Sequence, residues 1–407
     1  MKKNVPSYGK LSFLCCMSYF TCHFTRGNYA AALTEIIKDL EISKSLASLA
    51  VTGSFIALWI GQVVAGVMGD HIKPRRLVTI GLAAATAINI AMGFMSNIWV
   101  MTVLWTINGF FQAFLWPPMT RVMAENMDAH QYAKTAIGIS LSSTASSVLI
   151  YLLVPVAILA SGWRLAFWGA GAVGLAACLL WAIGTRGVRE GTPLGAKDLS
   201  KKTGASVSLG KVILLSGLLP LFIAQMALGA LRDGVMTWMP TFIFDQYHLS
   251  PSFSIFTTAL LPLFGMAGVL LAGKMEQRSR NLTKTSTVLF IVCAVAIAVM
   301  LPFYDKSVVL CILLISVLVG CAYGVTHLLT GQLPSAYSKY GCVSTISGLT
   351  TAVFYLGSTI STYGFAILTD RSGWFVTIAS WLVLSGIGIL TCAVNIKRWF
   401  RFEHGDE

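Results

Sequence analysis

Long apolar stretches of about 18 residues or more recur along nearly the whole sequence, and the polar segments between them are short. Each stretch is long enough to cross a hydrocarbon core roughly 30 Å thick as an α-helix. With 56% hydrophobic and only 11% charged residues, the chain has too few ionisable groups to cover a soluble globule of 407 residues. We therefore predict an all-α membrane protein with twelve transmembrane helices. The expected spans are residues 11–33, 47–69, 77–96, 99–121, 135–160, 165–184, 211–243, 252–275, 285–303, 307–333, 344–369 and 374–396.

The longest polar interruption is residues 185–210, which are rich in Gly, Ser and Lys. Such a composition is typical of a flexible linker, and we place it in the cytoplasm. It would separate an N-terminal six-helix half, residues 1–184, from a C-terminal six-helix half, residues 211–407, that ends in a short cytoplasmic tail. The second expected span ends in GVMGDHIKPRR and the eighth in GVLLAGKMEQRSR, so we interpret the halves as pseudo-symmetric repeats.

The basic residues gather on one side of the expected topology. With the N-terminus inside, 22 of the 29 Lys and Arg residues fall on cytoplasmic segments. The positive-inside rule therefore places both termini in the cytoplasm of a multi-pass protein of the plasma or inner membrane. This topology also explains the formal charge of +13, and nucleic acid is excluded as a partner because the basic residues are dispersed among short loops. The first apolar stretch is long and lacks a small-residue cleavage pattern, so we expect a span and not a signal peptide.

Two arginines lie inside apolar sequence at matching places in the two halves. Arg26 precedes Asp70 by 44 residues, and Arg232 precedes Glu276 by 44 residues. An arginine at mid-membrane costs roughly 2.5 to 3.5 kcal/mol on insertion scales, so it indicates a function. Its planar guanidinium donates two parallel hydrogen bonds, which suits phosphate. We predict that the two arginines bind one anion.

Three further polar side chains in the expected spans are candidates for the same site. His23 lies three residues before Arg26 on the same helical face and could donate a hydrogen bond or titrate. Asp233 is the one carboxylate within the expected spans, so it and His23 are the candidates for proton coupling. Adjacent residues on a helix point about 100° apart, so a direct Arg232–Asp233 pair is expected to be strained. The alternative role for Asp233 is to neutralise Arg232 between transport cycles. Gln112, one turn before Trp116-Pro117-Pro118, is predicted to face the transport pathway.

Four segments carry a resemblance to a known family. The run GDHIKPRR resembles the signature loop of the major facilitator superfamily, and TRGNYAAA, INGFFQAFLWPPMTRVM and RDGVMTWMPTFI are similar to segments of its organophosphate:phosphate antiporter family. The resemblance implies the major facilitator fold and exchange of inorganic phosphate for glycerol 3-phosphate or hexose phosphates. It also implies that the two arginines hold the phosphoryl group. By position it adds substrate-binding phenols at Tyr19, Tyr323 and Tyr355, and a conformational latch formed by Gly69, Asp70 and Arg76.

The sequence departs from this family at two positions. Gln62 stands where bacterial phosphate-ester members carry a lysine, and Ser143 lies near the place of a histidine. Both changes remove cationic donors, and Gln62 becomes a polar candidate for the site. A carboxylate or a differently shaped phosphorylated compound therefore stays open as the ligand.

The function predicted from the sequence is secondary active transport of an organic anion, most simply a phosphorylated metabolite exchanged for inorganic phosphate by alternating access. Proton-coupled symport of a carboxylate or other organic anion is one alternative, and a non-transporting membrane sensor of a sugar phosphate is another. We expect no enzyme, because the sequence has no P-loop, nucleophile elbow or metal-ligand cluster. No cofactor or metal is expected, and the expected partners are a small anion and the lipid bilayer. Monomer is the superfamily default.

Overall fold

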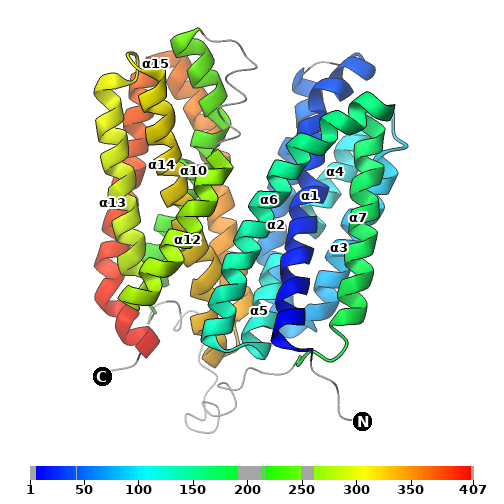
Figure 1. Cartoon of the computed structure of the whole chain (residues 1–407), viewed down its shortest axis with the longest axis horizontal. Coiled ribbons are helices and arrows are strands. Elements are labelled where there is room, and N and C mark those ends of the chain that lie inside the picture. Colours follow the sequence, from blue (N-terminus) through cyan, green and yellow to red (C-terminus); the bar gives the residue numbers. More distant parts are fainter. Residues whose placement is uncertain (1–5, 43, 191–212, 214–215, 249–260, 405–407) are drawn as a thin grey trace. The chain divides into compact units, whose positions relative to one another are not determined.

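A computed structural model describes residues 6–42, 44–190, 213, 216–248 and 261–404 (Figure 1). These residues are almost entirely helical, and no strand occurs among them. The α-helices are α1 (Tyr8–Asp39), α2 (Lys44–His71), α3 (Pro74–Met92), α4 (Ile98–Gln112), α5 (Trp116–Asn126), α6 (Ala129–Ser161), α7 (Trp163–Gly184), α10 (Leu218–Tyr247), α12 (Leu261–Ser279), α13 (Leu282–Met300), α14 (Val308–Thr326) and α15 (Val343–His404). A π-helix, His327–Gln332, and a 3₁₀ segment, Leu333–Tyr340, follow α14 directly.

Within the described ranges, ten helical segments are long and apolar enough to cross a membrane. Helix α1 is not one of them because polar and charged residues, among them Arg26, interrupt its apolar sequence. Helix α12 is described only from Leu261, so part of the expected span 252–275 lies outside the described residues. Helix α15 contains the last two expected spans and is divided at Gly373, where φ is 75°. The predicted all-α, multi-pass architecture is confirmed.

The chain forms two compact units. Unit 1 comprises residues 1–204 together with 337–352, and unit 2 comprises residues 205–336 and 353–407. In unit 1, α1 packs on α6, α2 on α4 and α3 on α7. The predicted linker, residues 185–210, lies outside the described residues from position 191 onward, so the division into two sequential halves remains a prediction.

Unit 2 is built on close contact between α12 and α14, with α13 packed on both. A Cβ atom placed on Gly268 of α12 would collide with the backbone carbonyl of Gly320 on α14. The reverse contact is also tight, since a Cβ on Gly324 would lie 2.9 Å from the carbonyl oxygen of Gly268. Small residues that let two backbones approach are typical of helix pairs in membranes, where lipid supplies no hydrophobic force between helices.

We expect Gly268→Ala to destabilise unit 2 by about 1–3 kcal/mol, because one methyl group forces α12 and α14 apart. The measurement is thermal unfolding of the purified protein in detergent. Gly386→Ala on α15 is the matched control, since a Cβ there meets no described atom within 4 Å. Equal melting temperatures for the two variants would contradict the close-packing argument.

Candidate anion-binding site

Helix α10 presents two adjacent charged residues beside a buried apolar face. Leu228, Leu231 and Val235 have no exposed surface and fix one side of the helix against its neighbours in unit 2. The neighbouring positions carry Arg232 and Asp233, whose side chains are 16% and 26% exposed. Both charges therefore lie in a membrane-length helix, partly accessible, at a place where a charge is costly unless it is paired or binds a ligand.

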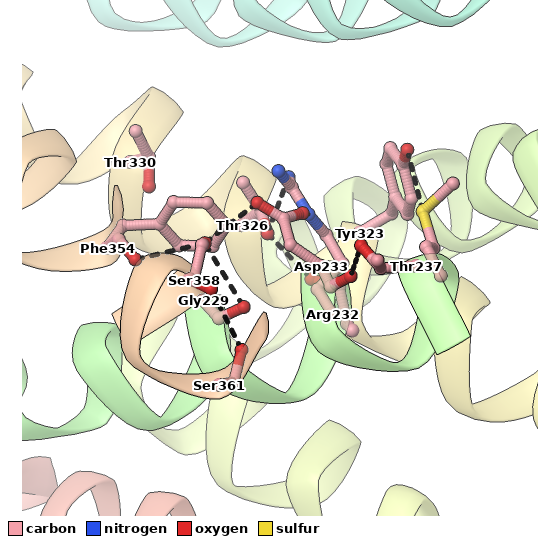
Figure 2. A network of polar contacts seen from close by, with 12 residues as sticks. Gly229, Arg232, Asp233, Thr237, Tyr323, Thr326, Thr330, Phe354, Ser358 and Ser361 are labelled. Carbon is pink, nitrogen blue, oxygen red and sulfur yellow. Dashed lines mark hydrogen bonds and ion pairs between the residues drawn. The ribbon is translucent and has the colours of Figure 1, made fainter. Parts of the chain in front are cut away.

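The guanidinium of Arg232 is held by four neighbours (Figure 2). Its Nε donates to Oδ1 of Asp233 at 2.8 Å, and its Nη1 donates to the hydroxyl of Thr326 at 3.3 Å. Its central carbon lies 4.4 Å from the ring centre of Phe354 and 5.0 Å from that of Tyr323. Cation–π contacts and directed hydrogen bonds together fix the plane of the guanidinium before any ligand arrives. The site is therefore organised for recognition of an anion.

The carboxylate of Asp233 uses both of its oxygens. Oδ1 accepts from Arg232, and Oδ2 accepts from the hydroxyl of Ser358 on α15 at 2.8 Å (Figure 2). The direct Arg232–Asp233 pair, which the helical angle between adjacent residues made unexpected, is present in the structure. Ser358 also lies 3.2 Å from the carbonyl oxygen of Gly229, so it connects α15 to α10 at two points.

The two predicted phenols of unit 2 lie near this ion pair. Tyr323 places its ring against Arg232 and donates its hydroxyl to the sulfur of Met236 at 3.4 Å. Tyr355 packs edge-on against Phe354, with ring centres 5.5 Å apart. The structure thus brings Tyr323 into contact with Arg232, and it brings Tyr355 into contact with Phe354, whose ring also contacts Arg232.

In unit 1 the predicted residues of α1 form a second cluster. Arg26 Nη2 lies 3.3 Å from Nδ1 of His23, as their spacing on one helical face predicts. The ring of His23 is 4.9 Å from that of Tyr19, which in turn lies 5.0 Å from the ring of Trp116 on α5. Tyr19, His23 and Arg26 therefore share one face of α1.

The two predicted glutamines differ in their surroundings. Gln112 donates from Nε2 to the Thr25 hydroxyl at 2.9 Å and accepts at Oε1 from the Cys22 thiol at 2.7 Å, so its amide binds α1 to α4. Gln62 on α2 is only 3% exposed, and no donor to its Oε1 occurs among the described residues. A buried amide oxygen left unpaired is costly, which makes Gln62 the glutamine better suited to a polar ligand.

A network of three buried asparagines supports α1, and it was not predicted from the sequence. Asn28 donates to Asn89 at 2.8 Å, while Asn89 and Asn108 donate to the backbone carbonyl of Thr25 at 2.9 and 3.4 Å. All three amides are at most 1% exposed. The signal in the sequence was three isolated asparagines in apolar helices. These hydrogen bonds fix the backbone of α1 beside Arg26, because they involve Thr25 and Asn28 on either side of it.

The predicted latch contains a helix cap within unit 1. Asp70, near the end of α2, accepts from the backbone N–H groups of Ser344 and Thr345 at 3.0 and 2.7 Å, at the start of α15. A carboxylate there satisfies otherwise unpaired donors and interacts favourably with the helix dipole. The adjacent Gly69 is so close to Ser344 that a Cβ atom would collide with its hydroxyl.

The arginine that contacts the latch backbone is Arg121 of α5, which sequence reasoning missed. Its Nη1 donates to the carbonyl oxygens of Gly69 and Asp70 at 2.8 and 2.6 Å, and its Nε pairs with Glu125 at 2.6 Å. Arg76 is exposed near the start of α3. The spacing of Arg121 and Glu125, four residues apart in one helix, was the available signal.

The sequence profile of the Major Facilitator Superfamily matches residues 15–362. The chain belongs to the major facilitator superfamily. Its relatives include a protein named as a probable hexose phosphate transport protein of Chlamydia pneumoniae, 26% identical over 92% of this chain and 88% of the relative. The membrane sensor protein UhpC of Escherichia coli strain K12 is 25% identical over 92% and 89% of the two chains.

Solved structures of this superfamily have the same fold. The proton:xylose symporter XylE superposes with a TM-score of 0.78 over 98% of this chain and 96% of its own, at 12% identity. The predicted resemblance to the organophosphate:phosphate antiporter family is confirmed by relatives that match over most of their length. Membership of a transporter superfamily also confirms that the chain is not an enzyme.

Proposed function

We propose that this superfamily member is a secondary transporter of the inner membrane that exchanges a phosphorylated metabolite for inorganic phosphate by alternating access. The observation that carries the proposal is the fixed, partly exposed guanidinium of Arg232 inside a membrane-length helix. Relatives named for hexose phosphate transport supply the substrate class. The distribution of basic residues supports cytoplasmic termini in this proposal.

In this proposal Arg26 and Arg232 bind the same phosphoryl group. A guanidinium has five N–H donors, and the described partners of Arg232 use two of them. The remaining donors are available for the parallel bonds that bind phosphate oxygens. The additional substrate-binding candidates are Tyr19, His23, Tyr323, Tyr355, Gln62 and Gln112. Tyr19 and His23 lie on the face of α1 that carries Arg26, and Tyr323 and Tyr355 lie near Arg232. The two glutamines are buried in unit 1.

Exchange follows from the charge of the empty site. An arginine that has lost its anion retains its charge, and this charge opposes conformational change until another anion binds. The latch, Gly69, Asp70 and Arg76, would stabilise one conformation through the contact of Asp70 with the start of α15.

Proteoliposomes that contain the purified protein test the exchange directly. We expect the best substrate from a panel of labelled phosphate esters to enter vesicles loaded with inorganic phosphate at least about tenfold faster than vesicles loaded with sulfate. Internal phosphate binds the emptied site and allows it to return to the outward-facing conformation. Carboxylates in the same panel should enter slowly. Equal entry into both kinds of vesicle would contradict antiport.

Proton-coupled symport is the second candidate, because Asp233 and His23 are ionisable groups in direct contact with the two arginines. The discriminating measurement imposes an inward proton gradient on vesicles without internal phosphate. Antiport predicts that the proton gradient changes the initial rate of substrate uptake by less than about twofold. Symport requires that the substrate accumulate inside the vesicles and that an uncoupler abolish this accumulation.

A sensor is the third candidate, because the relative UhpC is named as a membrane sensor protein. Phosphate-ester binding by the purified chain, combined with no flux in the vesicles, would favour that function over transport.

A further inference from the structure

The carboxylate of Asp233 lies directly beside the proposed anion-binding group of unit 2. Its oxygens accept one hydrogen bond each from described partners, Arg232 Nε and the Ser358 hydroxyl, both at 2.8 Å. An ionised carboxylate offers about four lone-pair positions, so Asp233 retains acceptor capacity. Its side chain is 26% exposed, more than that of Arg232 at 16%. A ligand that reaches Arg232 therefore also reaches Asp233.

This neighbour is unfavourable for a simple anion. A phosphoryl group bound to the remaining donors of Arg232 would come close to a second negative charge, and the repulsion is stronger in a membrane protein than in water. A plain carboxylate ligand meets the same repulsion. A ligand gains from Asp233 only if it presents a donor or a positive charge on that side.

The charge balance of the proposed site leads to the same requirement. Arg232 and Asp233 cancel, and Arg26 then leaves one net positive charge when His23 is neutral. A phosphate monoester carries about −1.5 to −2 charge at pH 7. An ammonium group on the ligand would reduce this excess and would also convert the repulsion from Asp233 into a charge-assisted hydrogen bond.

We propose that the transported phosphate ester carries an ammonium group a short distance from its phosphoryl group, and that Asp233 binds the ammonium while Arg232 binds the phosphoryl oxygens. This inference rests on the proposed function and narrows its substrate class to zwitterionic phosphate esters. Ser358 is the positioning residue, because its bond to Oδ2 orients the carboxylate. Tyr323 and Phe354 orient the guanidinium beside it.

A matched pair of competitors tests the proposal on the full-length protein in detergent. Binding of ³²P-labelled inorganic phosphate is measured by scintillation proximity, with 2-aminoethyl phosphate or 2-hydroxyethyl phosphate as competitor. The two compounds differ only by an ammonium in place of a hydroxyl. We expect 2-aminoethyl phosphate to displace the label at a concentration at least about tenfold lower, as one charge-assisted hydrogen bond implies. A wild-type ratio below about twofold overturns the inference without any variant.

Asp233→Asn identifies the residue responsible. It should reduce the ratio of the two competitors to about twofold or less, whereas Asp245→Asn, in the same helix at its contact with Trp374, should leave the ratio unchanged. Asp233→Glu keeps the charge and should retain a preference for the ammonium compound. A preference that persists in Asp233→Asn would overturn the role of Asp233. If neither compound displaces phosphate from the wild-type protein, both the inference and the proposed function fail. Equal displacement by the two compounds contradicts only the inference.

Discussion

Arg232→Lys is expected to reduce phosphate exchange in proteoliposomes by about 100-fold or more, although lysine keeps the positive charge. The guanidinium donates to Asp233 and Thr326 and has further N–H donors for an anion. An ammonium cannot reproduce that planar arrangement. Loss of two charge-assisted hydrogen bonds at about 1.5–3 kcal/mol each accounts for the magnitude. Initial rates of labelled phosphate uptake into phosphate-loaded vesicles provide the measurement.

Arg26→Lys should have a similar effect if both arginines bind the phosphoryl group. Arg164→Lys is the matched control, because Arg164 pairs with Asp39 at 2.8 Å in an exposed position, with 31% and 47% of the two side chains accessible. The control should transport at the wild-type rate. Near-normal exchange in both Arg26→Lys and Arg232→Lys, with normal amounts of protein in the vesicles, would refute the two-arginine proposal.

Arg121→Met is expected to destabilise unit 1 by about 3–5 kcal/mol, because it leaves a buried carboxylate without its partner. The Glu125 side chain is only 3% exposed, and its Oε1 accepts from Arg121 at 2.6 Å. The same substitution removes the donor to the carbonyl oxygens of Gly69 and Asp70 in the latch. Thermal unfolding in detergent measures the loss.

Two further variants make this second prediction specific. Arg121→Met combined with Glu125→Met removes both charges and should recover most of the stability, since an apolar pair is tolerated where a lone charge is not. Arg164→Met breaks an exposed ion pair with Asp39, a hydrogen bond to Ser96 and a stacking contact with Trp163, and should cost about 0–1 kcal/mol. If Arg121→Met and Arg164→Met unfold at the same temperature, the buried pair does not stabilise the latch region.

The fold could be predicted from the sequence because it depends on features that are local and long. An apolar stretch of membrane length specifies a helix, because every backbone donor must be satisfied within the segment. The same reasoning identified Arg26 and His23 as neighbours, since they are three residues apart on one helix and the structure places their nitrogens 3.3 Å apart. The family resemblance was visible in short motifs within those helices and is confirmed over most of the chain.

The contacts between helices could not be predicted, because they depend on which faces meet. Nothing in the sequence near Asp70 indicates that its carboxylate caps residues 344 and 345, more than 270 positions later. Ser358 as a partner of Asp233, and the asparagines that hold the carbonyl of Thr25, arise for the same reason. The contact between Arg232 and the adjacent Asp233 depends on side-chain conformation, which ideal helical angles do not describe.

The central claim is that Arg26 and Arg232 bind one phosphoryl group. Electron cryo-microscopy of the purified full-length protein, with saturating 2-aminoethyl phosphate, tests it most directly. The claim predicts ligand density with phosphoryl oxygens about 2.7–2.9 Å from guanidinium nitrogens of both arginines. Density that contacts only one of the two arginines, or phosphate bound away from both, would contradict it.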